Sequence, residues 1–311
     1  LVDCFTPERV AAITWVTAEK IRAATRFFST LRPACYYTYN GIEQHTNAMQ
    51  TSRAIGIFFA LTGNFDVPGG NVLFPRIKTN KVDGKEEFPP AKKPLGKEKR
   101  PLGPANVQAK DLYEAILSGK PSPVRAVVSF GGNVLTANGD SRLGREAMQK
   151  LDFFVQVDLF ETPAGRTADI LLPAATPWES FFLKTTFEGD EKTSSYLQLA
   201  PQVISPLYES WPDIKIIFAL AEKLGLKDKF WNGDIEAAYN YQLAPSGITV
   251  ADLRKNQGGI FVPLPVKYRK YQDRQGDGVK GFDTPSGLVE IYAETFLEKG
   301  AHFKGSLSYE G

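Results

Sequence analysis

The fold of this chain is decided by residues 124–133, which read VRAVVSFGGN. An apolar, β-prone run of this kind that ends in glycines predicts a buried strand followed by a tight turn. A second such run, residues 153–157, closes at Asp158, and helix signals over residues 141–151 separate the two runs. A spacing of about 30 residues from strand through helix to strand is typical of a right-handed parallel crossover. Residues 167–172 predict a third strand, so the sequence indicates an α/β fold around a parallel sheet.

The N-terminal part of the chain predicts a second unit of the same kind. Residues 7–30 carry the signals of two helices, and residues 34–39 form a β-prone run that ends at Asn40-Gly41. Apolar residues at helical spacing predict a further helix over residues 44–61. Strand, sharp turn and helix in that order are half of a doubly wound sheet, so we expect two Rossmann-like units with parallel sheets.

Composition divides the chain further. Residues 76–110 contain ten Lys or Arg, four Asp or Glu and five Pro, which favours a solvated linker over regular structure. A turn at residues 284–287 precedes an expected strand over residues 288–292. The expected order is one α/β domain (residues 1–75), a basic Pro-rich linker (76–123), a second α/β domain (124–230) and a connector to a C-terminal domain (231–311).

The composition excludes several classes of function. The 311 residues are 42% hydrophobic, which is enough for a folded core, and a net charge of +2 gives no field that would attract nucleic acid. No apolar run reaches the roughly 18 residues of a membrane span, and the first residues lack the pattern of an export signal. Two cysteines and two histidines are too few for a disulfide framework, an iron–sulfur cluster or a protein-only zinc site.

Residues at the ends of the predicted strands are candidates for binding, because ligands of open parallel sheets lie outside the carboxyl ends of the strands. Gly131 and Gly132 let the backbone approach an anionic group, and Asp158 can accept hydrogen bonds from both hydroxyls of a ribose. These are the parts of a nucleotide site, although the full G-x-G-x-x-G fingerprint is absent. Asp140 and Asp169 are more often a helix cap and a turn residue than ligands.

Other polar and sulfur-containing residues have structural interpretations. Gln44 and His45 are expected to fix the start of their own helix, with contact to a ligand as the alternative. Cys4 and Cys35 are expected to be small buried hydrophobic residues. The sequence contains no nucleophile elbow, Walker loop or cluster of metal ligands, so it names no catalytic residue.

Short motifs occur in a fixed order over nearly the whole chain. They are NGIEQHTN (40–47), RAI (53–55), LTGN (61–64), PGG (68–70), GGN (131–133), LDF (151–153), VDLFET (157–162), ADILLPAA (168–175) and GFDTPSG (281–287). The first four resemble the G-x-x-Q-H-T-x-G, R-A and L-T-G-N…P-G-G motifs of the molybdopterin oxidoreductases of the dimethyl sulfoxide reductase family. The next four resemble its G-x-N-P, L-D-F, Q-D-x-F-x-T and A-D-V-V-L-P-A-A motifs. The last resembles the G-F-x-T-P-S-G that leads into its C-terminal β-barrel domain.

The resemblance implies a cofactor of two molybdopterin guanine dinucleotides, each in one α/β domain, which hold molybdenum or tungsten through dithiolene sulfurs. In such an enzyme Asp158 anchors the ribose or the guanine of one dinucleotide. The other residues expected at that dinucleotide are Gly131, Gly132, Asn133, Thr162 and Asp169. The residues expected in the other domain, nearer the pterin and the metal, are Asn40, Gly41, Gln44 and His45.

The resemblance also implies an iron–sulfur electron-transfer subunit as partner and a small-molecule substrate. A [4Fe–4S] cluster is expected only upstream, because the family's cysteine cluster and the segment with the protein ligand of the metal are both missing here. Val134 replaces the usual proline of G-x-N-P, and Val157 stands where many members have glutamine. We therefore expect a central piece of a larger catalytic subunit that has no turnover alone.

Three functions are open at this stage. The first is a molybdenum or tungsten oxidoreductase that moves an oxygen atom or a hydride with two electrons in anaerobic respiration. The second is a non-redox member of the same family, such as a tungsten hydratase. The third is a non-catalytic nucleotide-binding or assembly module that kept the fold. The sequence does not decide the substrate or the compartment, since members of the family occur both in the cytoplasm and in the periplasm.

Overall fold

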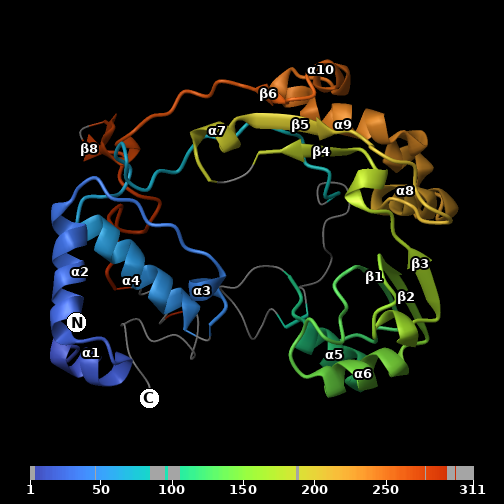
Figure 1. The fold of residues 1–311 in the computed structure, drawn as a ribbon, viewed down its shortest axis with the longest axis horizontal. Coiled ribbons are helices and arrows are strands. Elements are labelled where there is room, and N and C mark those ends of the chain that lie inside the picture. The colour runs from blue at the N-terminus through green and yellow to red at the C-terminus, as the bar shows by residue number, and fades with distance from the viewer. Residues whose placement is uncertain are drawn as a thin grey trace. The chain divides into compact units, whose positions relative to one another are not determined.

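The computed structural model describes residues 4–45, 47–84, 95–96, 106–186, 189–276, 278–292 and 298. The chain forms two compact units: Leu1–Phe74 with Pro265–Gly311, and Pro75–Leu264 (Figure 1). Both are mixtures of helices and short strands. Within the described part of the chain, every helix is too short or too polar to cross a bilayer.

Helices dominate the N-terminal part of the first unit. The predicted helix pair is confirmed, and each member begins after a threonine, Thr6 or Thr17, whose hydroxyl accepts a backbone hydrogen bond from the first turn. The ring of Phe28 meets that of Phe59 edge to face at 5.2 Å between centroids, which packs the second helix against the fourth. The helices are α1 (Pro7–Thr14), α2 (Ala18–Thr30), α3 (Asn40–Glu43) and α4 (Ala48–Leu61).

The strand predicted over residues 34–39 is wrong, because no strand pairs with this segment among the described residues. Two asparagine side chains take the backbone groups that a neighbouring strand would bind. The amide of Ala34 donates to Oδ1 of Asn64 at 2.9 Å. Asn71 binds both backbone groups of Tyr36, accepting from its amide at 2.8 Å and donating to its carbonyl at 2.9 Å. The expected doubly wound sheet is therefore not formed in the described residues of this unit.

An ion pair ties the C-terminal part of the first unit to the loop after α4. The carboxylate of Asp66, only 3% exposed, contacts the ammonium group of Lys270. The same carboxylate accepts a hydrogen bond from the backbone amide of Lys270, and the carbonyl of Asp66 accepts one from the amide of Arg269 at 2.8 Å. The elements that follow are the 3-10 helix η6 (Lys270–Gln272) and the antiparallel strands β7 (Arg274–Gln275) and β8 (Gly278–Val279).

The predicted turn over residues 284–287 is confirmed, since the amide of Gly287 donates to the carbonyl of Thr284 at 3.0 Å. The strand predicted after it, over residues 288–292, is wrong. Local side-chain bonds compete for its backbone, because the hydroxyl of Thr284 donates to the carbonyl of Leu288 at 2.7 Å. No start of a β-barrel is seen in the described residues of this segment, and residues 299–311 lie outside them.

The second unit contains the predicted parallel sheet. Its order is β1-β2-β3, and both pairs are parallel, with Val128 opposite Val155 and Val155 opposite Ile170. The predicted helix between the first two strands is confirmed as α6, whose first turn is capped by the carboxylate of Asp140. The bounds are β1 (Ala126–Phe130), α6 (Ser141–Lys150), β2 (Phe153–Asp158) and β3 (Ile170–Pro173).

One core lies between this sheet and a helical layer that the sequence did not predict in full. Helix α5 (Ala109–Ser118) packs beside α6, and Figure 1 shows the two helices together on one side of the strands. Tyr113 of α5, Met148 of α6 and Phe154 of β2 are almost completely buried in this core. The structure thus differs from the expected linker over residues 76–123, because the apolar face of α5 must be covered by a sheet or helix.

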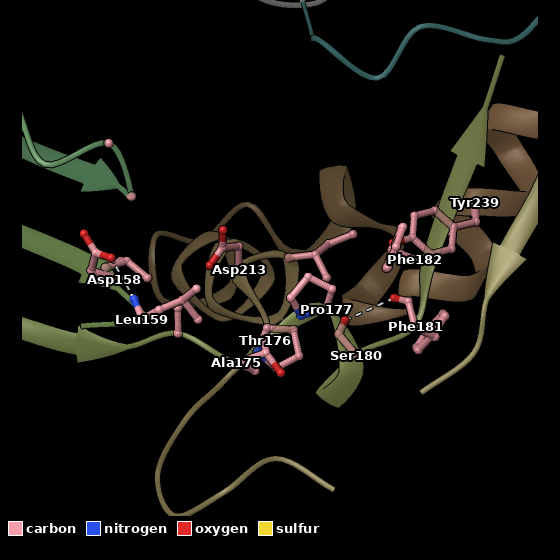
Figure 2. A pocket seen from close by; sticks show the side chains of 16 residues that line it. Asp158, Leu159, Ala175, Thr176, Pro177, Ser180, Phe181, Phe182, Asp213 and Tyr239 are labelled. Atoms are coloured by element: carbon pink, nitrogen blue, oxygen red, sulfur yellow. Dashed lines mark hydrogen bonds between the residues drawn. The ribbon is translucent and has the colours of Figure 1, made fainter. Parts of the chain in front are cut away.

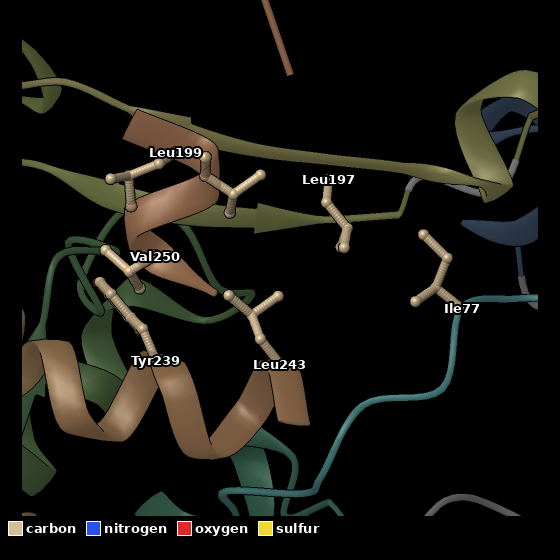
Figure 3. Close-up of a cluster of buried hydrophobic side chains, with 7 residues drawn as sticks. Ile77, Leu197, Leu199, Tyr239, Leu243 and Val250 are labelled. Atoms are coloured by element: carbon tan, nitrogen blue, oxygen red, sulfur yellow. The ribbon is translucent and has the colours of Figure 1, made fainter. Parts of the chain in front are cut away.

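A second, antiparallel sheet of order β4-β5-β6 carries the other core of this unit. Residues from it and from two helices beyond residue 231 form a buried cluster (Figure 3). The first part of the expected connector over residues 231–311 is therefore built into this core. The cluster consists of Ile77, Leu197, Leu199, Tyr239, Leu243, Val250 and Leu253.

The predicted helix near residues 213–226 is confirmed as α8, which ends just before Gly225. The strands of the antiparallel sheet are β4 (Phe182–Thr185), β5 (Tyr196–Ala200) and β6 (Ile260–Phe261). The remaining α-helices are α7 (Glu191–Ser194), α8 (Asp213–Lys223), α9 (Ile235–Leu243) and α10 (Val250–Lys255). The remaining 3-10 helices are η2 (Gly165–Thr167), η3 (Pro177–Glu179), η4 (Lys227–Gly233) and η5 (Ala244–Ser246).

Candidate functional site

A cleft of about 640 Å³ opens at the carboxyl edge of the parallel sheet in the second unit. All three strands contribute to it: Gly131 and Gly132 follow β1, Asp158 ends β2, and the segment from Ala174 to Thr176 follows β3. Figure 2 shows Asp158 and Asp213 toward one end of the cleft and Phe182 and Tyr239 toward the other. This is the place where α/β sheets of this kind bind their ligands.

The glycine pair forms the tip of the loop after β1. Gly131 and Gly132 have φ values of +61° and +81°, which only glycine adopts without strain. A Cβ atom built on either residue would meet no heavy atom within 4 Å. The amide of Gly131 is already used, since it donates to the carbonyl of Val157 at 2.7 Å. The glycines therefore let a ligand approach the backbone closely, whereas the Gly131 amide itself does not serve as an anion donor.

Two carboxylates define the polar end of the cleft. Asp158 is half-buried and accepts hydrogen bonds from the amide of Leu159 at 2.8 Å and from the side-chain amide of Gln156 at 3.2 Å. Asp213 stands in the first turn of α8. Partial burial raises the pKa of Asp213, and the charge of Asp158 raises it further. The lining residues in the described part of the chain include no Lys, Arg or His. The cleft therefore suits a ligand that presents N–H or O–H groups.

The segment after β3 is held by a buried glutamate. Glu179 is 4% exposed and its Oε2 accepts hydrogen bonds from the amide and the hydroxyl of Thr176, at 2.7 and 2.8 Å. Its Oε1 accepts from the amide of Leu207 at 2.7 Å. These bonds, the one from the Thr176 amide foremost, lower the pKa of Glu179. The ionised side chain of Glu179 thus holds Thr176, which lines the cleft, in place through two hydrogen bonds.

Aromatic side chains form the other end of the cleft. Phe181 and Tyr239 meet edge to face, with ring centroids 5.8 Å apart and ring planes at 89°. Tyr239 is buried in the core of the antiparallel sheet, and this burial raises the pKa of its hydroxyl. The cleft therefore joins an acidic end made by the parallel sheet to an apolar end made by the antiparallel sheet and α9.

The structure brings Gly131, Gly132 and Asp158 together in one cleft, as their places at strand ends predicted. Three other predicted residues do not line it and make bonds within the fold. Oδ1 of Asn133 accepts from the amide of Ala164 at 3.4 Å, the hydroxyl of Thr162 from Gly165 at 3.2 Å, and the carboxylate of Asp169 from Phe154 at 2.7 Å. The bond from Phe154 joins Asp169 to the start of β2, which agrees with the structural interpretation of this residue.

The predicted residues of the first unit lie on or just after helix α3, and all of them are exposed. Asn40 begins this four-residue helix and Gly41 is its second residue, so neither ends a strand. The expectation that Gln44 and His45 begin the following helix is wrong, because Gln44 ends α3 and α4 starts at Ala48. Their role near a pterin and a metal stays a prediction.

Both cysteines are exposed, so the expectation that Cys4 and Cys35 are buried is wrong. Cys35 lies in the extended segment whose backbone is bound by asparagines, which leaves its side chain outside the core. No group of three or more His, Cys, Asp or Glu side chains in the described residues could hold a metal ion.

Sequence reasoning missed Asp213 as a member of the site. Its place in the first turn of a helix after Trp211-Pro212 is that of an ordinary helix-start residue. No local signal marks it, because two strands of the antiparallel sheet separate β3 from α8, and the N-terminus of α8 returns to the carboxyl edge of the parallel sheet only in the folded chain. The hydrogen bonds between Pro173 and Trp211 and between Trp211 and Ala175 make this return.

Fold and site together define an α/β protein with a cleft at the carboxyl edge of a parallel sheet. A family model described as molybdopterin oxidoreductase matches residues 10–223. The chain therefore belongs to the molybdopterin oxidoreductase family, and the resemblance of its motifs to the dimethyl sulfoxide reductases is confirmed. Membership of this family implies a molybdopterin cofactor with molybdenum or tungsten.

Individual relatives include a hydratase, a reductase and a dehydroxylase. Acetylene hydratase of Syntrophotalea acetylenica is 27% identical over 325 residues, covering 94% of this chain and 43% of that protein. Dimethyl sulfoxide reductase of Haemophilus influenzae is 27% identical over 319 residues, covering 94% of this chain and 38% of that protein. Dopamine dehydroxylase of Eggerthella lenta is 30% identical over 265 residues, covering 78% of this chain and 25% of that protein.

A solved structure shares the fold. Acetylene hydratase from Pelobacter acetylenicus superposes with a TM-score of 0.82 and 26% identity, covering 99% of this chain and 45% of that chain. The chain spans less than half the length of each of these relatives. The mixed α/β architecture is thus shared over almost the whole chain.

Proposed function

We propose that this chain is part of the catalytic subunit of a molybdenum or tungsten enzyme with two molybdopterin guanine dinucleotides, and that its cleft binds the guanosine end of one of them. The observation that carries the proposal is the meeting of Gly131, Gly132, Asp158 and Asp213 at the carboxyl edge of the parallel sheet. Family membership supplies the cofactor class, and the cleft supplies a place for its nucleotide.

The donor and acceptor groups of the cleft fit a guanosine. Carboxylates only accept hydrogen bonds, and the Watson–Crick edge of guanine presents N–H donors at N1 and N2. The hydroxyls of a ribose are donors as well. Asp158 and Asp213 are therefore suited to the base or the sugar, whereas repulsion between their charges and a phosphate keeps the pyrophosphate away from this end.

The role of the chain in this proposal is to bind and to orient. The metal bound by the dithiolene groups supplies the two-electron chemistry, and the protein holds the cofactor in place. Asn40, Gly41, Gln44 and His45 are proposed to lie nearer the pterin and the metal. This chain has only two cysteines, too few to ligate a [4Fe–4S] cluster. Any such cluster of the enzyme would therefore need ligands from residues outside these 311. A separate iron–sulfur subunit and a small-molecule substrate complete the proposal.

A non-redox hydratase is the second candidate, because the chain is 27% identical to acetylene hydratase over 94% of its length, as it is to dimethyl sulfoxide reductase. Two measurements on the purified full-length protein separate the candidates. An oxidoreductase needs an external electron donor or acceptor for turnover, and addition of its substrate alone would change the oxidation state of the metal. A hydratase turns over substrate without a net change of electrons, so its activity continues when the acceptor is omitted.

Metal and nucleotide analysis tests the cofactor itself. We expect stoichiometric molybdenum or tungsten in the full-length protein and release of two GMP per metal after hydrolysis of the extracted cofactor. Molybdopterin without guanine nucleotide would refute the assignment of the cleft. Absence of both metals would favour the third function, a non-catalytic nucleotide-binding or assembly module.

A further inference from the structure

Gln156 is a completely buried polar residue directly behind the cleft. It is the fourth residue of β2, between Val155 and Val157, and none of its surface is exposed. The two N–H groups of its side-chain nitrogen are shared among three acceptors, which are the carbonyl of Gly131 at 3.0 Å, the carbonyl of Val157 at 3.2 Å and the carboxylate of Asp158 at 3.2 Å. One side chain thus joins the loop after β1 to the acid that ends β2.

The orientation of this amide is determined by its neighbours. All three groups around the nitrogen are acceptors, so rotation of the amide by half a turn would place oxygen against oxygen. The amide oxygen, Oε1 of Gln156, is buried and has no hydrogen-bond partner among the described residues. An unpaired buried acceptor is unfavourable, and a methionine or leucine would fill the space without it.

The retained feature is therefore the donor end of the side chain. The carbonyl of Gly131 also accepts from the hydroxyl of Ser129 at 3.1 Å, so it would keep a partner without Gln156. Among the described residues, the carboxylate of Asp158 would keep only the amide of Leu159, which binds its other oxygen. Loss of the glutamine donor would therefore leave Oδ2 of Asp158 without its protein partner and free the carboxylate to rotate.

We infer that Gln156 is a positioning residue, which holds the carboxylate of Asp158 at a fixed distance from the Gly131 loop so that both meet one nucleoside. The inference rests on the proposed function for the identity of the ligand, a guanine nucleotide. The link that Gln156 makes between Asp158 and Gly131 does not depend on which ligand the cleft binds. The two parts can therefore be tested separately.

The experiment compares Gln156→Met with the parent 311-residue chain and with Gln198→Leu. Methionine has nearly the length of glutamine and no donor, so it keeps the packing. Gln198 is a matched control, because it lies on β5 outside the cleft and its side chain donates only to the carbonyl of Gln257, at 3.3 Å. Amide hydrogen exchange without ligand and titration with GMP are measured for each protein.

We expect Gln156→Met to bind GMP about tenfold more weakly and to exchange the amides of Gly131 and Leu159 faster, with neither change in the control. A variant that is less stable but keeps the affinity and exchange of the parent would overturn the inference. If the parent itself does not bind GMP, the proposed function fails, and the exchange rates alone then decide the role of Gln156.

Gln156→Glu is the second variant and covers the case that methionine prevents folding. A buried carboxyl beside Asp158 binds a proton more tightly than usual, and its O–H group then donates as the amide does. We expect the affinity of this variant for GMP, relative to the parent at the same pH, to recover as the pH falls. The comparison with the parent at each pH removes the effect of Asp158 and Asp213, which both proteins contain. If the ratio of the two GMP affinities, variant to parent, were the same at all pH values, Gln156 would not act as a donor.

Discussion

Asp158 and Asp213 line one cleft from different elements, and partial burial together with the charge of Asp158 raises the pKa of Asp213. Asp158 ends the middle strand of the parallel sheet, and Asp213 stands in the first turn of α8, the helix that follows the antiparallel strand β5. No basic side chain lies among the described residues that line the cleft. The pair therefore forms an acceptor surface, which is what distinguishes this crevice from a site for phosphate.

Replacement of Asp158 tests the contact with the nucleoside. We expect Asp158→Ala to weaken binding of GMP to the 311-residue chain by about tenfold, because a hydrogen bond to a charged group is lost. Isothermal titration with GMP and AMP measures this, and the loss should be larger for GMP. Asp140→Ala is the matched control: it removes the cap of α6 and lowers the free energy of unfolding by about 1 kcal/mol, with unchanged affinity. Equal affinities of Asp158→Ala and the parent would refute the assignment.

The raised pKa of Asp213 predicts a dependence of stability on pH. A carboxyl whose pKa is higher in the folded state than in the unfolded state holds its proton more tightly when folded. Its contribution to the free energy of unfolding therefore decreases as the pH rises from the ordinary value of 3.8 through the raised value. The decrease should be below about 1 kcal/mol, because Asp213 is partly solvated and its interactions are screened.

The measurement for Asp213 is urea unfolding across this pH range. Asp213→Asn has no titrating group at this position, so the slope of stability against pH should become less negative than in the parent. Asp228→Asn provides a comparison with an acid that does not line the cleft. Identical slopes in the parent and in Asp213→Asn would show that Asp158 and burial do not act on this group.

The core of the antiparallel sheet predicts that residues beyond 231 stabilise the second unit. Leu243 of α9 is completely buried, so Leu243→Ala should lower the free energy of unfolding by about 2–5 kcal/mol. Leu224 is 74% exposed, and Leu224→Ala should change it by no more than about 0.5 kcal/mol. Denaturant unfolding of both variants checks this. A loss at Leu243 as small as that at Leu224 would mean that the helices beyond residue 231 are not part of the core.

Asn71 is expected to stabilise the extended segment of the first unit. Asn71→Ala removes both bonds to the backbone of Tyr36 and should lower the free energy of unfolding by about 1–3 kcal/mol. Asn71→Asp keeps an oxygen that accepts from the amide of Tyr36 but turns a charged oxygen toward the carbonyl of Tyr36, so its effect should be at least as large as that of Asn71→Ala. Unfolding free energies and hydrogen exchange at Tyr36 measure the two variants. Equal exchange in all three proteins would show that the asparagine does not replace a strand.

The parallel sheet could be predicted because its signals are local. Each strand is a contiguous β-prone run, and each ends at a glycine, an aspartate or a proline, so the bounds follow from neighbouring residues. The segment over residues 34–39 has the same local signal and is not a strand. The side chains that bind its backbone in place of a strand, Asn64 and Asn71, lie about 30 residues away along the chain. The sequence of the segment itself does not predict these bonds.

The site was predictable to the same extent. Gly131, Gly132 and Asp158 are strand-end residues, and the parallel arrangement alone brings strand ends to one edge. Asn133 and Thr162 follow the ends of β1 and β2 closely, yet their side chains make bonds within the fold. Asp169 comes directly before β3, at the opposite edge of the sheet, where its carboxylate accepts from the amide of Phe154. Whether a side chain at a strand end faces the cleft or the fold depends on the path of the following loop.

The sequence by itself determined the class of this protein, because motif order, strand runs and strand-end residues are properties of neighbouring amino acids. Only the tertiary structure decided that Asp213 faces Asp158 and that Gln156 holds this acid from behind. It also decided that the segment before α3 is bound by asparagines instead of by a strand. The physical reason is that burial, charge coupling and hydrogen-bond competition depend on distances in space between residues that are remote along the chain.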